Sequence, residues 1–267
     1  MSVRDPGLAF TDGAIQFESW SEKLWDPMAR EVIAAAALTA GERVLDACCG
    51  TGAATIPAAE AVGPSGTVDG VDLSTGLLRL AAAKLSGRGI LNTTLTEADA
   101  TDWRGHRTFD AVLCSYSMFF FDDMDAGVDH LLSMLRPGGR FVTSTWIAGA
   151  LEPFAGRIMA AAITERPRLA GVVPVANGNM ARVDTVESMA AWLSARGLVD
   201  VTVLTRPLTL TVDDEMAWNL VMGSGWRTLL PRDPEAIARV RKEFIRSVGP
   251  RVDMNSDTLI GIGSIPR

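Results

Sequence analysis

The sequence Val44-Leu45-Asp46-Ala47-Cys48-Cys49-Gly50-Thr51-Gly52 decides the fold of this chain. It begins as a short apolar run of the kind found in buried strands and turns through small residues into residues 53–62, which have the composition of a helix. Glycines at a strand-to-helix turn let the backbone approach a ligand, because they carry no Cβ. The stretch therefore predicts a cofactor site at the first turn of an α/β fold.

The same strand-and-helix pattern repeats along the first half of the chain. Ser74 has the side chain of a helix cap, and Pro137-Gly138-Gly139 predicts a turn that ends a helix. Repeated alternation of this kind favours a parallel sheet with helices on both faces. The expected strands after the first are residues 66–72, 93–98, 109–115 and 140–146, and the expected helices include residues 75–85 and 125–135.

The second half of the chain departs from this pattern. A helix is expected near residues 153–165, and Asp184-Thr185-Val186-Glu187 predicts a capping box for a helix that ends at Arg196. A strand from Val199 either stops near Thr205 or continues past Pro207 to Val212, with the proline at a bulge or edge. The remaining expected elements are helices at 213–222 and 233–247, which would cover the sheet edge, and a last strand at 259–265.

The length of 267 residues fits one domain with an elaboration. We expect a helical lid at residues 1–40, a cofactor-binding core at 41–150, and the remaining strands with an inserted helical cap at 151–267.

The net charge of -7 argues against a nucleic-acid partner and favours a small-molecule substrate. No leader pattern or apolar run of membrane-spanning length occurs, so we expect a soluble cytoplasmic protein with no membrane partner. The cysteine and histidine spacing predicts no disulfide and no metal site.

Five motifs in order give the chain a family resemblance. Besides the opening stretch they are Val71-Asp72-Leu73-Ser74, Ala98-Asp99-Ala100, Phe109-Asp110-Ala111-Val112 and Leu135-Arg136-Pro137-Gly138-Gly139-Arg140-Phe141. With them the chain resembles the class I S-adenosylmethionine-dependent methyltransferases, nearest to the ubiquinone and menaquinone biosynthesis type. The resemblance implies a seven-stranded Rossmann-like sheet with an antiparallel final hairpin, S-adenosylmethionine as cofactor, and possible homo-oligomers. Cys48 departs from the family pattern, in which the first glycine often stands at that position.

The resemblance and the chemistry of the side chains together predict how the cofactor is held. Asp72 would accept hydrogen bonds from the ribose hydroxyls, Asp99 and the Ala100 N–H would face the adenine edge, and Asp46 would lie near the methionine end. A single aspartate at a strand end is often only a helix cap, but three at successive strand ends favour a cofactor site. A nicotinamide dinucleotide is disfavoured, because its fingerprint needs glycine or alanine where Thr55 stands. The predicted cofactor-binding residues are Asp46, Ala47, Cys48, Gly50, Thr51, Asp72, Leu73, Asp99, Ala100, Ser115 and Trp25.

The acceptor of the methyl group is less clearly marked in the sequence. Tyr116, the only tyrosine, follows the fourth expected strand and is the candidate catalytic residue, although a core or capping role is about as probable. His106 and His130 fit exposed positions better than a catalytic base. A set of methionines and tryptophans in the second half would suit a ring-bearing substrate, or would be ordinary core: Met189, Trp192, Met216, Trp218, Met222 and Trp226.

We therefore predict an enzyme that methylates O or C of a small apolar metabolite, either quinone-like or a secondary metabolite. The alternative is a protein of the same fold that binds S-adenosylmethionine but no longer methylates, acting as a cyclase or a regulator. The motifs leave both open, because they describe capture of the cofactor and not transfer of its methyl group.

Overall fold

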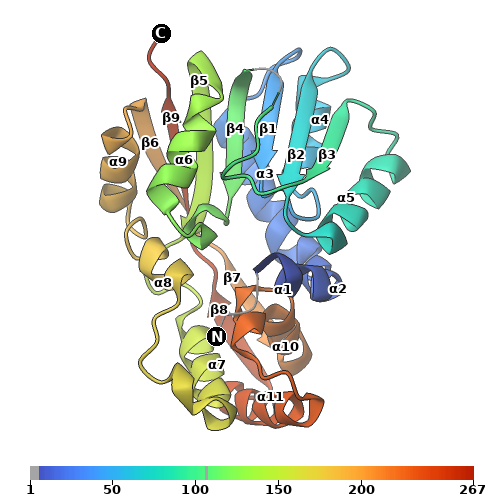
Figure 1. Cartoon of the computed structure of the whole chain (residues 1–267), viewed down its shortest axis with the longest axis vertical. Helices are drawn as coiled ribbons and strands as arrows, with labels where there is room; N and C mark the ends of the chain where they lie inside the picture. The colour runs from blue at the N-terminus through green and yellow to red at the C-terminus, as the bar shows by residue number, and fades with distance from the viewer. Residues whose placement is uncertain (1–5, 106–107) are drawn as a thin grey trace.

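A seven-stranded sheet forms the centre of the computed structural model, which describes residues 6–105 and 108–267 (Figure 1). Its strand order is β3-β2-β1-β4-β5-β9-β6, and only β9 runs antiparallel to its neighbours β5 and β6. The mostly parallel α/β sheet and the antiparallel final pair confirm the predicted fold class. The strands are β1 (Arg43–Ala47), β2 (Thr67–Asp72), β3 (Thr93–Glu97), β4 (Phe109–Ser115), β5 (Leu135–Trp146), β6 (Val199–Arg206) and β9 (Thr258–Ser264).

Helices cover both faces of this sheet, as a parallel sheet requires. Helices α3 (Asp26–Ala36) and α4 (Thr55–Val62) share one apolar core with it, whereas α6 (Met124–Ser133) and α9 (Val186–Ala195) share another on the opposite face. Helix α5 (Thr75–Gly87) packs against β2 and β3 and is capped by Ser74, whose hydroxyl accepts from the Leu77 N–H at 3.2 Å.

Two local predictions from the sequence were wrong in detail. The Pro137-Gly138-Gly139 segment does not separate a helix from a strand but bulges within β5, because Phe109 pairs with Leu135 while Ala111 pairs with Arg140. Pro137 has no N–H to donate, and Gly138 has a φ of 72°, so neither extends a regular ladder. The capping box of α9 pairs Thr185 with Ser188, not Asp184 with Glu187.

The chain between β6 and β9 forms a second, smaller lobe. Strand β6 ends at Arg206, and the residues after Pro207 form β7 (Thr209–Asp213), which pairs with β8 (Arg251–Asn255), a strand that the sequence did not predict. The prediction that the inserted helices cover the sheet edge was wrong, because α10 (Asp214–Met222) and α11 (Pro234–Val248) pack against each other in the second lobe, away from the edge strand β6 (Figure 1). The lobe also contains α7 (Glu152–Glu165), α8 (Val175–Met180) and the short turns η3 (Pro167–Leu169) and η4 (Gly225–Leu229).

The N-terminal segment joins this lobe to the sheet. It comprises α1 (Pro6–Asp12), α2 (Ala14–Glu18) and the π-helical turn η1 (Ser21–Trp25). Its backbone approaches α10 so closely that a Cβ on Gly13 would lie 2.2 Å from the Met222 carbonyl oxygen, and one on Gly223 would lie 2.3 Å from the Phe17 nitrogen. On the other side, Glu18 pairs with Lys84 of α5 at 3.0 Å. The segment is therefore held across both lobes.

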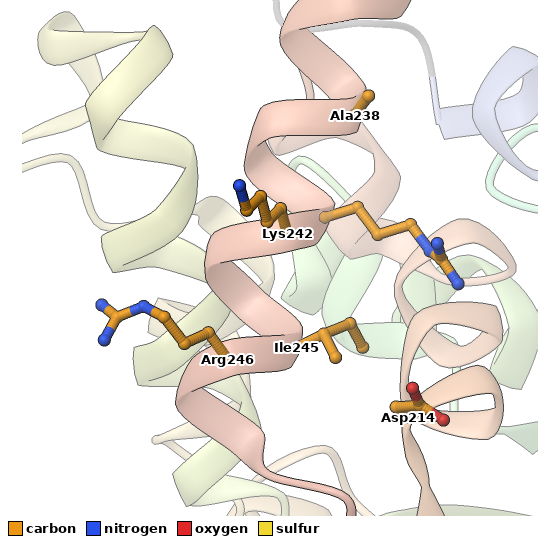
Figure 2. A pocket seen from close by; sticks show the side chains of 6 residues that line it. Asp214, Ala238, Lys242, Ile245 and Arg246 are labelled. Carbon is orange, nitrogen blue, oxygen red and sulfur yellow. The ribbon is translucent and has the colours of Figure 1, made fainter.

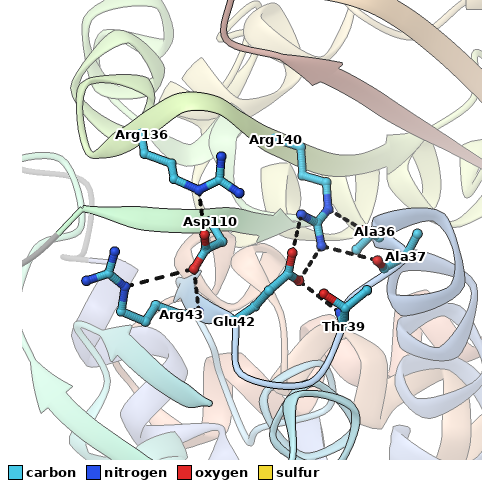
Figure 3. Close-up of polar contacts among 8 residues, drawn as sticks. All are labelled: Ala36, Ala37, Thr39, Glu42, Arg43, Asp110, Arg136 and Arg140. Carbon is cyan, nitrogen blue, oxygen red and sulfur yellow. Dashed lines mark hydrogen bonds and ion pairs between the residues drawn. The ribbon is translucent and has the colours of Figure 1, made fainter. Parts of the chain in front are cut away.

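A charged cluster secures the opposite end of the sheet, where β1 and β4 begin (Figure 3). Asp110 accepts from the Arg43 N–H at 2.8 Å and from Arg136 at 2.5 Å. Arg140 pairs with both carboxylate oxygens of Glu42 and donates to the carbonyl groups at the end of α3. The arginines of the fifth sequence motif therefore stabilise the fold and lie far from the carboxyl ends of the strands. None of the helices in the described residues is long and apolar enough to cross a membrane.

Candidate active site

The strand order brings the predicted cofactor residues to one edge of the sheet. The chain moves outward from β1 through β2 to β3, then returns to place β4 on the other side of β1. Ligands of open α/β sheets bind where the strand order reverses in this way, at the carboxyl ends of the strands. Asp46 and Asp72 occupy the ends of β1 and β2, and Asp99 follows β3. All three acids therefore lie at the same edge of the sheet.

Asp72 organises the turn that follows β1. Its two carboxylate oxygens accept from the Gly50 N–H and the Ser74 N–H, each at 2.8 Å. Burial raises the pKa of Asp72, and these two backbone hydrogen bonds oppose the shift. Asp72 is half-buried, and its carboxylate ties β2 to the glycine turn.

Asp46 is enclosed beneath the same turn. Thr55, the first residue of α4, donates its hydroxyl to one Asp46 oxygen at 2.6 Å. Burial raises the pKa of Asp46 to about 7, with the nearby Asp72 charge acting in the same direction. Thr55 is thus explained structurally: the hydroxyl that departs from a dinucleotide fingerprint satisfies a buried acid.

Asp99 lies more openly than the other two acids. One of its oxygens accepts from the Thr101 N–H and from the Thr101 hydroxyl, at 2.8 and 2.7 Å. Its other oxygen accepts no hydrogen bond from the described residues and is free to receive one from a ligand. Leu73, which follows β2, is 48% exposed, whereas Ala100 is buried.

The turn itself has the backbone that a close ligand approach requires. Cys48, Gly50 and Gly52 have φ angles of 59°, 55° and 81°, all in the left-handed region. Ala47 is fully buried at the end of β1, and the Thr51 and Ser115 hydroxyls are buried without a hydrogen-bond partner in the described part of the chain. Buried hydroxyls normally have a partner, so these two orphaned groups fit a site that is completed by a polar ligand.

The left-handed φ of Cys48 is unfavourable for a residue with a Cβ. This conformation explains why glycine often stands at this position of the motif. We expect Cys48→Gly to be more stable than Cys48→Ala by about 0.5–1 kcal/mol, since both lose the thiol but only glycine removes the Cβ. Urea unfolding of the two variants measures the difference. An alanine variant equal to or more stable than the glycine variant would contradict a strained backbone at this residue.

An aromatic cluster lies beside the glycine turn. The Phe17 ring is 3.7 Å from where a Cβ on Gly50 would stand, and it stacks on Trp25 with ring centroids 4.8 Å apart. Trp25 in turn contacts Tyr116 and Trp146, at 5.8 and 6.3 Å between centroids. The π-helical turn η1 inserts an extra residue into the helical path and so brings Trp25 toward the sheet. We call Phe17, Trp25, Tyr116 and Trp146 the aromatic cluster.

Tyr116 lies at the end of β4 within this cluster. Its ring centroid is 4.4 Å from that of Trp146, and its hydroxyl is 2.6 Å from the Thr258 hydroxyl on β9. Burial raises the pKa of the Tyr116 phenol well above its usual range. Tyr116 is therefore a neutral phenol, which can position a ligand but is poorly suited to act as a base.

Of the two histidines, His130 lies in the described residues, and its surroundings do not point to proton transfer. His130 is half-buried, and one ring nitrogen lies 2.7 Å from the Trp103 carbonyl oxygen on the outer side of α6. His106 lies outside the described residues. The described residues contain no group of three or more His, Cys, Asp or Glu side chains that could hold a metal ion.

The methionines and tryptophans of the second half divide between two places. Met189 and Trp192 of α9 are core residues on the sheet face, and Trp192 donates to Asp125 at 3.0 Å. The other four pack around the apolar core that includes Trp25, Tyr116 and Trp146 of the aromatic cluster: Met216, Trp218, Met222 and Trp226. A surface hollow of about 390 Å³ between α10 and α11 is lined by Asp214, Lys242 and Arg246 among others and contains no residue from the strand ends (Figure 2).

Sequence reasoning missed three residues of the site. Phe17 was included only in the predicted lid at residues 1–40, Trp146 was the end of a predicted strand, and Thr258 was the residue before the last predicted strand. Their contacts join segments far apart in the chain; Tyr116 and Thr258, for example, are separated by 142 positions in the sequence. The only available signal was the position of Trp146 at the carboxyl end of a strand next to β4.

Comparisons with known proteins agree with this geometry. A family model described as a methyltransferase domain matches residues 44–139. The chain is 35% identical over 149 residues to aklanonic acid methyltransferase DauC of Streptomyces sp. strain C5, covering 55% of this chain and 67% of that protein. It is 27% identical over 252 residues to nocamycin O-methyltransferase of Saccharothrix syringae, covering 87% and 86% of the two chains.

A solved structure supports the fold over the whole chain. Phosphoethanolamine N-methyltransferase 2 of Haemonchus contortus, in complex with S-adenosyl-L-methionine, superposes with a TM-score of 0.59 at 17% identity, covering 100% of this chain and 60% of that one. The glycine turn, the acids at three strand ends and the orphaned hydroxyls fit this cofactor. The chain therefore belongs to the class I S-adenosylmethionine-dependent methyltransferases, in the branch that acts on small molecules, and S-adenosylmethionine is its cofactor.

Proposed function

We propose that this methyltransferase transfers the methyl group to an oxygen or carbon atom of a small, apolar, ring-bearing metabolite. The observation that carries the proposal is the aromatic cluster, whose Phe17 ring lies 3.7 Å from where a Cβ on Gly50 would stand and which continues to the ends of β4 and β5. Rings of this kind bind other rings by stacking and edge contacts and bury large apolar areas. The names of the two relatives specify aklanonic acid and nocamycin, which is consistent with acceptors of the secondary-metabolite class.

For the cofactor we propose one role for each strand end. Asp72 accepts from the ribose hydroxyls, the free oxygen of Asp99 and the Ala100 N–H face the adenine, and Leu73 packs against it. Asp46, Ala47, Cys48, Gly50 and Thr51 surround the methionine end. Ser115 supplies a hydroxyl there, and Trp25 closes the site from the N-terminal segment. Support for this arrangement comes from the open oxygen of Asp99 and from the partnerless hydroxyls of Thr51 and Ser115.

The sulfonium of S-adenosylmethionine supplies an activated methyl group when it is bound. The chain's own contribution is then alignment of the acceptor and exclusion of water, which together are worth on the order of 7–11 kcal/mol. The aromatic cluster and the N-terminal segment are suited to both tasks, because they enclose the strand ends with apolar side chains. We further propose that residues 1–40 act as a lid, that 41–150 bind the cofactor, that 151–267 complete the acceptor site, and that the protein is cytoplasmic.

A labelled transfer assay tests the proposed acceptor class. The protein is incubated with methyl-labelled S-adenosylmethionine and either a naphthohydroquinone or phosphoethanolamine. We expect label in the hydroquinone product only, and less of it with Trp25→Ala than with Leu8→Ala, a matched change on the exposed surface of the same segment. Label in phosphoethanolamine alone would contradict the acceptor class. Tight binding of the cofactor with no label in either compound, or in a metabolite extract, would instead support the alternative of a binding protein.

A further inference from the structure

Three hydroxyl and carbonyl groups form a chain at the end of the aromatic cluster. The Thr258 hydroxyl donates to the Ser256 carbonyl oxygen at 3.1 Å, and it lies 2.6 Å from the Tyr116 hydroxyl. A carbonyl oxygen only accepts, and a threonine hydroxyl has one proton. Both contacts are hydrogen bonds at the same time only when the Tyr116 hydroxyl is the donor to Thr258.

The Tyr116 side chain is fixed in this arrangement from several sides. Its backbone is left-handed, with a φ of 52°, and its N–H donates to the Ser144 carbonyl oxygen at 3.0 Å. Its ring is packed against Trp146, which is the direct partner of Thr258 in the pairing of β5 with β9. A residue held in an unfavourable φ by its surroundings is often part of a functional site. The phenol proton therefore points away from the aromatic cluster toward β9.

We propose that Thr258 is a positioning residue that fixes the direction of the Tyr116 hydroxyl, so that the Tyr116 oxygen accepts a hydrogen bond from an O–H or N–H group of the methyl acceptor. This inference rests on the proposed acceptor site. With its own proton used by Thr258, the Tyr116 oxygen has lone pairs left and nothing to donate. The chain of hydroxyls ends at a carbonyl, which takes up no proton, so Tyr116 orients the acceptor and does not deprotonate it. An acceptor with a hydroxyl is thereby preferred over its own methyl ether.

The direction of the hydroxyl is measurable because the chain has a single tyrosine. The tyrosine Fermi doublet in the Raman spectrum distinguishes a phenol that donates from one that accepts, and every tyrosine signal here belongs to Tyr116. We expect a strong-donor spectrum for the protein, loss of it in Thr258→Val, and restoration in Thr258→Ser. Thr258→Ala replaces the valine variant if the latter does not fold. A spectrum that is not of the donor type, or that is unchanged without the hydroxyl at position 258, overturns the proposal.

The preference for a donor on the ligand is tested with naphthol and its methyl ether, in the presence of the product nucleoside. We expect naphthol to bind about 3- to 10-fold more tightly than the ether, which is the worth of one hydrogen bond. The preference should disappear in Tyr116→Phe and in Thr258→Val but remain in Thr258→Ser. Absence of the preference in the unchanged protein, including absence of measurable binding, overturns this role for the Tyr116 oxygen.

Failure of this inference is distinct from failure of the proposed function. Calorimetry with S-adenosylmethionine and the labelled transfer assay report on the function, whereas the Raman spectrum and the ligand preference report on Thr258 and Tyr116. Methyl transfer to a ring-bearing acceptor with no naphthol preference would overturn only the inference. A donor-type Raman spectrum with no transfer to any acceptor would instead contradict the proposed function.

Discussion

Asp72→Ala is expected to weaken binding of S-adenosylmethionine by about 10- to 100-fold, as measured by calorimetry. The change removes a carboxylate at the end of β2, and hydrogen bonds to a charged group contribute about 1.5–3 kcal/mol. One change thereby removes the proposed ribose contact. The same substitution should also lower the stability of the protein without cofactor.

That second loss arises because Asp72 also accepts from Gly50 and Ser74. Without the carboxylate, the Gly50 N–H loses the partner that ties the glycine turn to β2, and we expect the free energy of unfolding to fall by about 1–3 kcal/mol. Weaker binding therefore has two sources in this variant: a lost ligand contact and a loosened turn. Urea unfolding without cofactor measures the second source alone.

Asp99→Ala serves as the matched control that separates these sources. Asp99 is exposed, and among the described residues its side chain bonds only to Thr101, so its removal should weaken binding while stability changes by less than about 0.5 kcal/mol. Asp72→Asn retains an acceptor oxygen, so its cofactor affinity and its stability should both lie between those of the unchanged protein and those of Asp72→Ala. Unchanged cofactor affinity in Asp72→Ala would show that the ribose is not held by this residue.

The proposed cofactor residues at the carboxyl ends of the strands were predictable from the sequence, because the signals for them are local. An apolar strand followed by small residues fixes the first turn, and an acid after each of the next two strands lies at the same edge in any parallel sheet. The positions of Asp46, Asp72 and Asp99 could be predicted once the strands before them had been recognised. The methyltransferase family and its cofactor followed from the same motifs and are confirmed by the relatives.

The surroundings of the acceptor were not predictable in this way. Thr258 meets Tyr116 only because β9 inserts between β5 and β6, and Phe17 meets Gly50 only because a segment before the sheet folds over it. Such contacts depend on the packing of distant segments and leave no periodic trace in the sequence. Pro207 shows the same limit: it signalled an interrupted strand but not that β7 would leave the sheet and pair with β8.

The buried acid Asp46 makes the second large prediction, which concerns stability and pH. Its pKa is about 7 in the folded protein, compared with an ordinary value of 3.8, so the folded protein holds the proton more tightly than the unfolded chain. The contribution of Asp46 to stability therefore falls as the pH rises from about 4 to about 7 and then levels off, because above pH 7 the ionised form must be kept in a buried site. A shift of about three pKa units corresponds to roughly 4 kcal/mol.

Asp46→Asn should abolish this loss, since an amide is neutral throughout and its oxygen can still accept from the Thr55 hydroxyl. In urea unfolding without cofactor, we expect the variant to exceed the unchanged protein by up to about 4 kcal/mol near pH 8 and to match it near pH 4. Asp110→Asn is the control of opposite sign, because hydrogen bonds from Arg136 and Arg43 overcome the effect of burial and hold the pKa of Asp110 below its ordinary value. That substitution should destabilise the protein near pH 8. If Asp46→Asn gave the same difference in stability at both pH values, Asp46 would be ionised across the range, and the Thr55 hydroxyl would be enough to keep a charged carboxylate beneath the glycine turn.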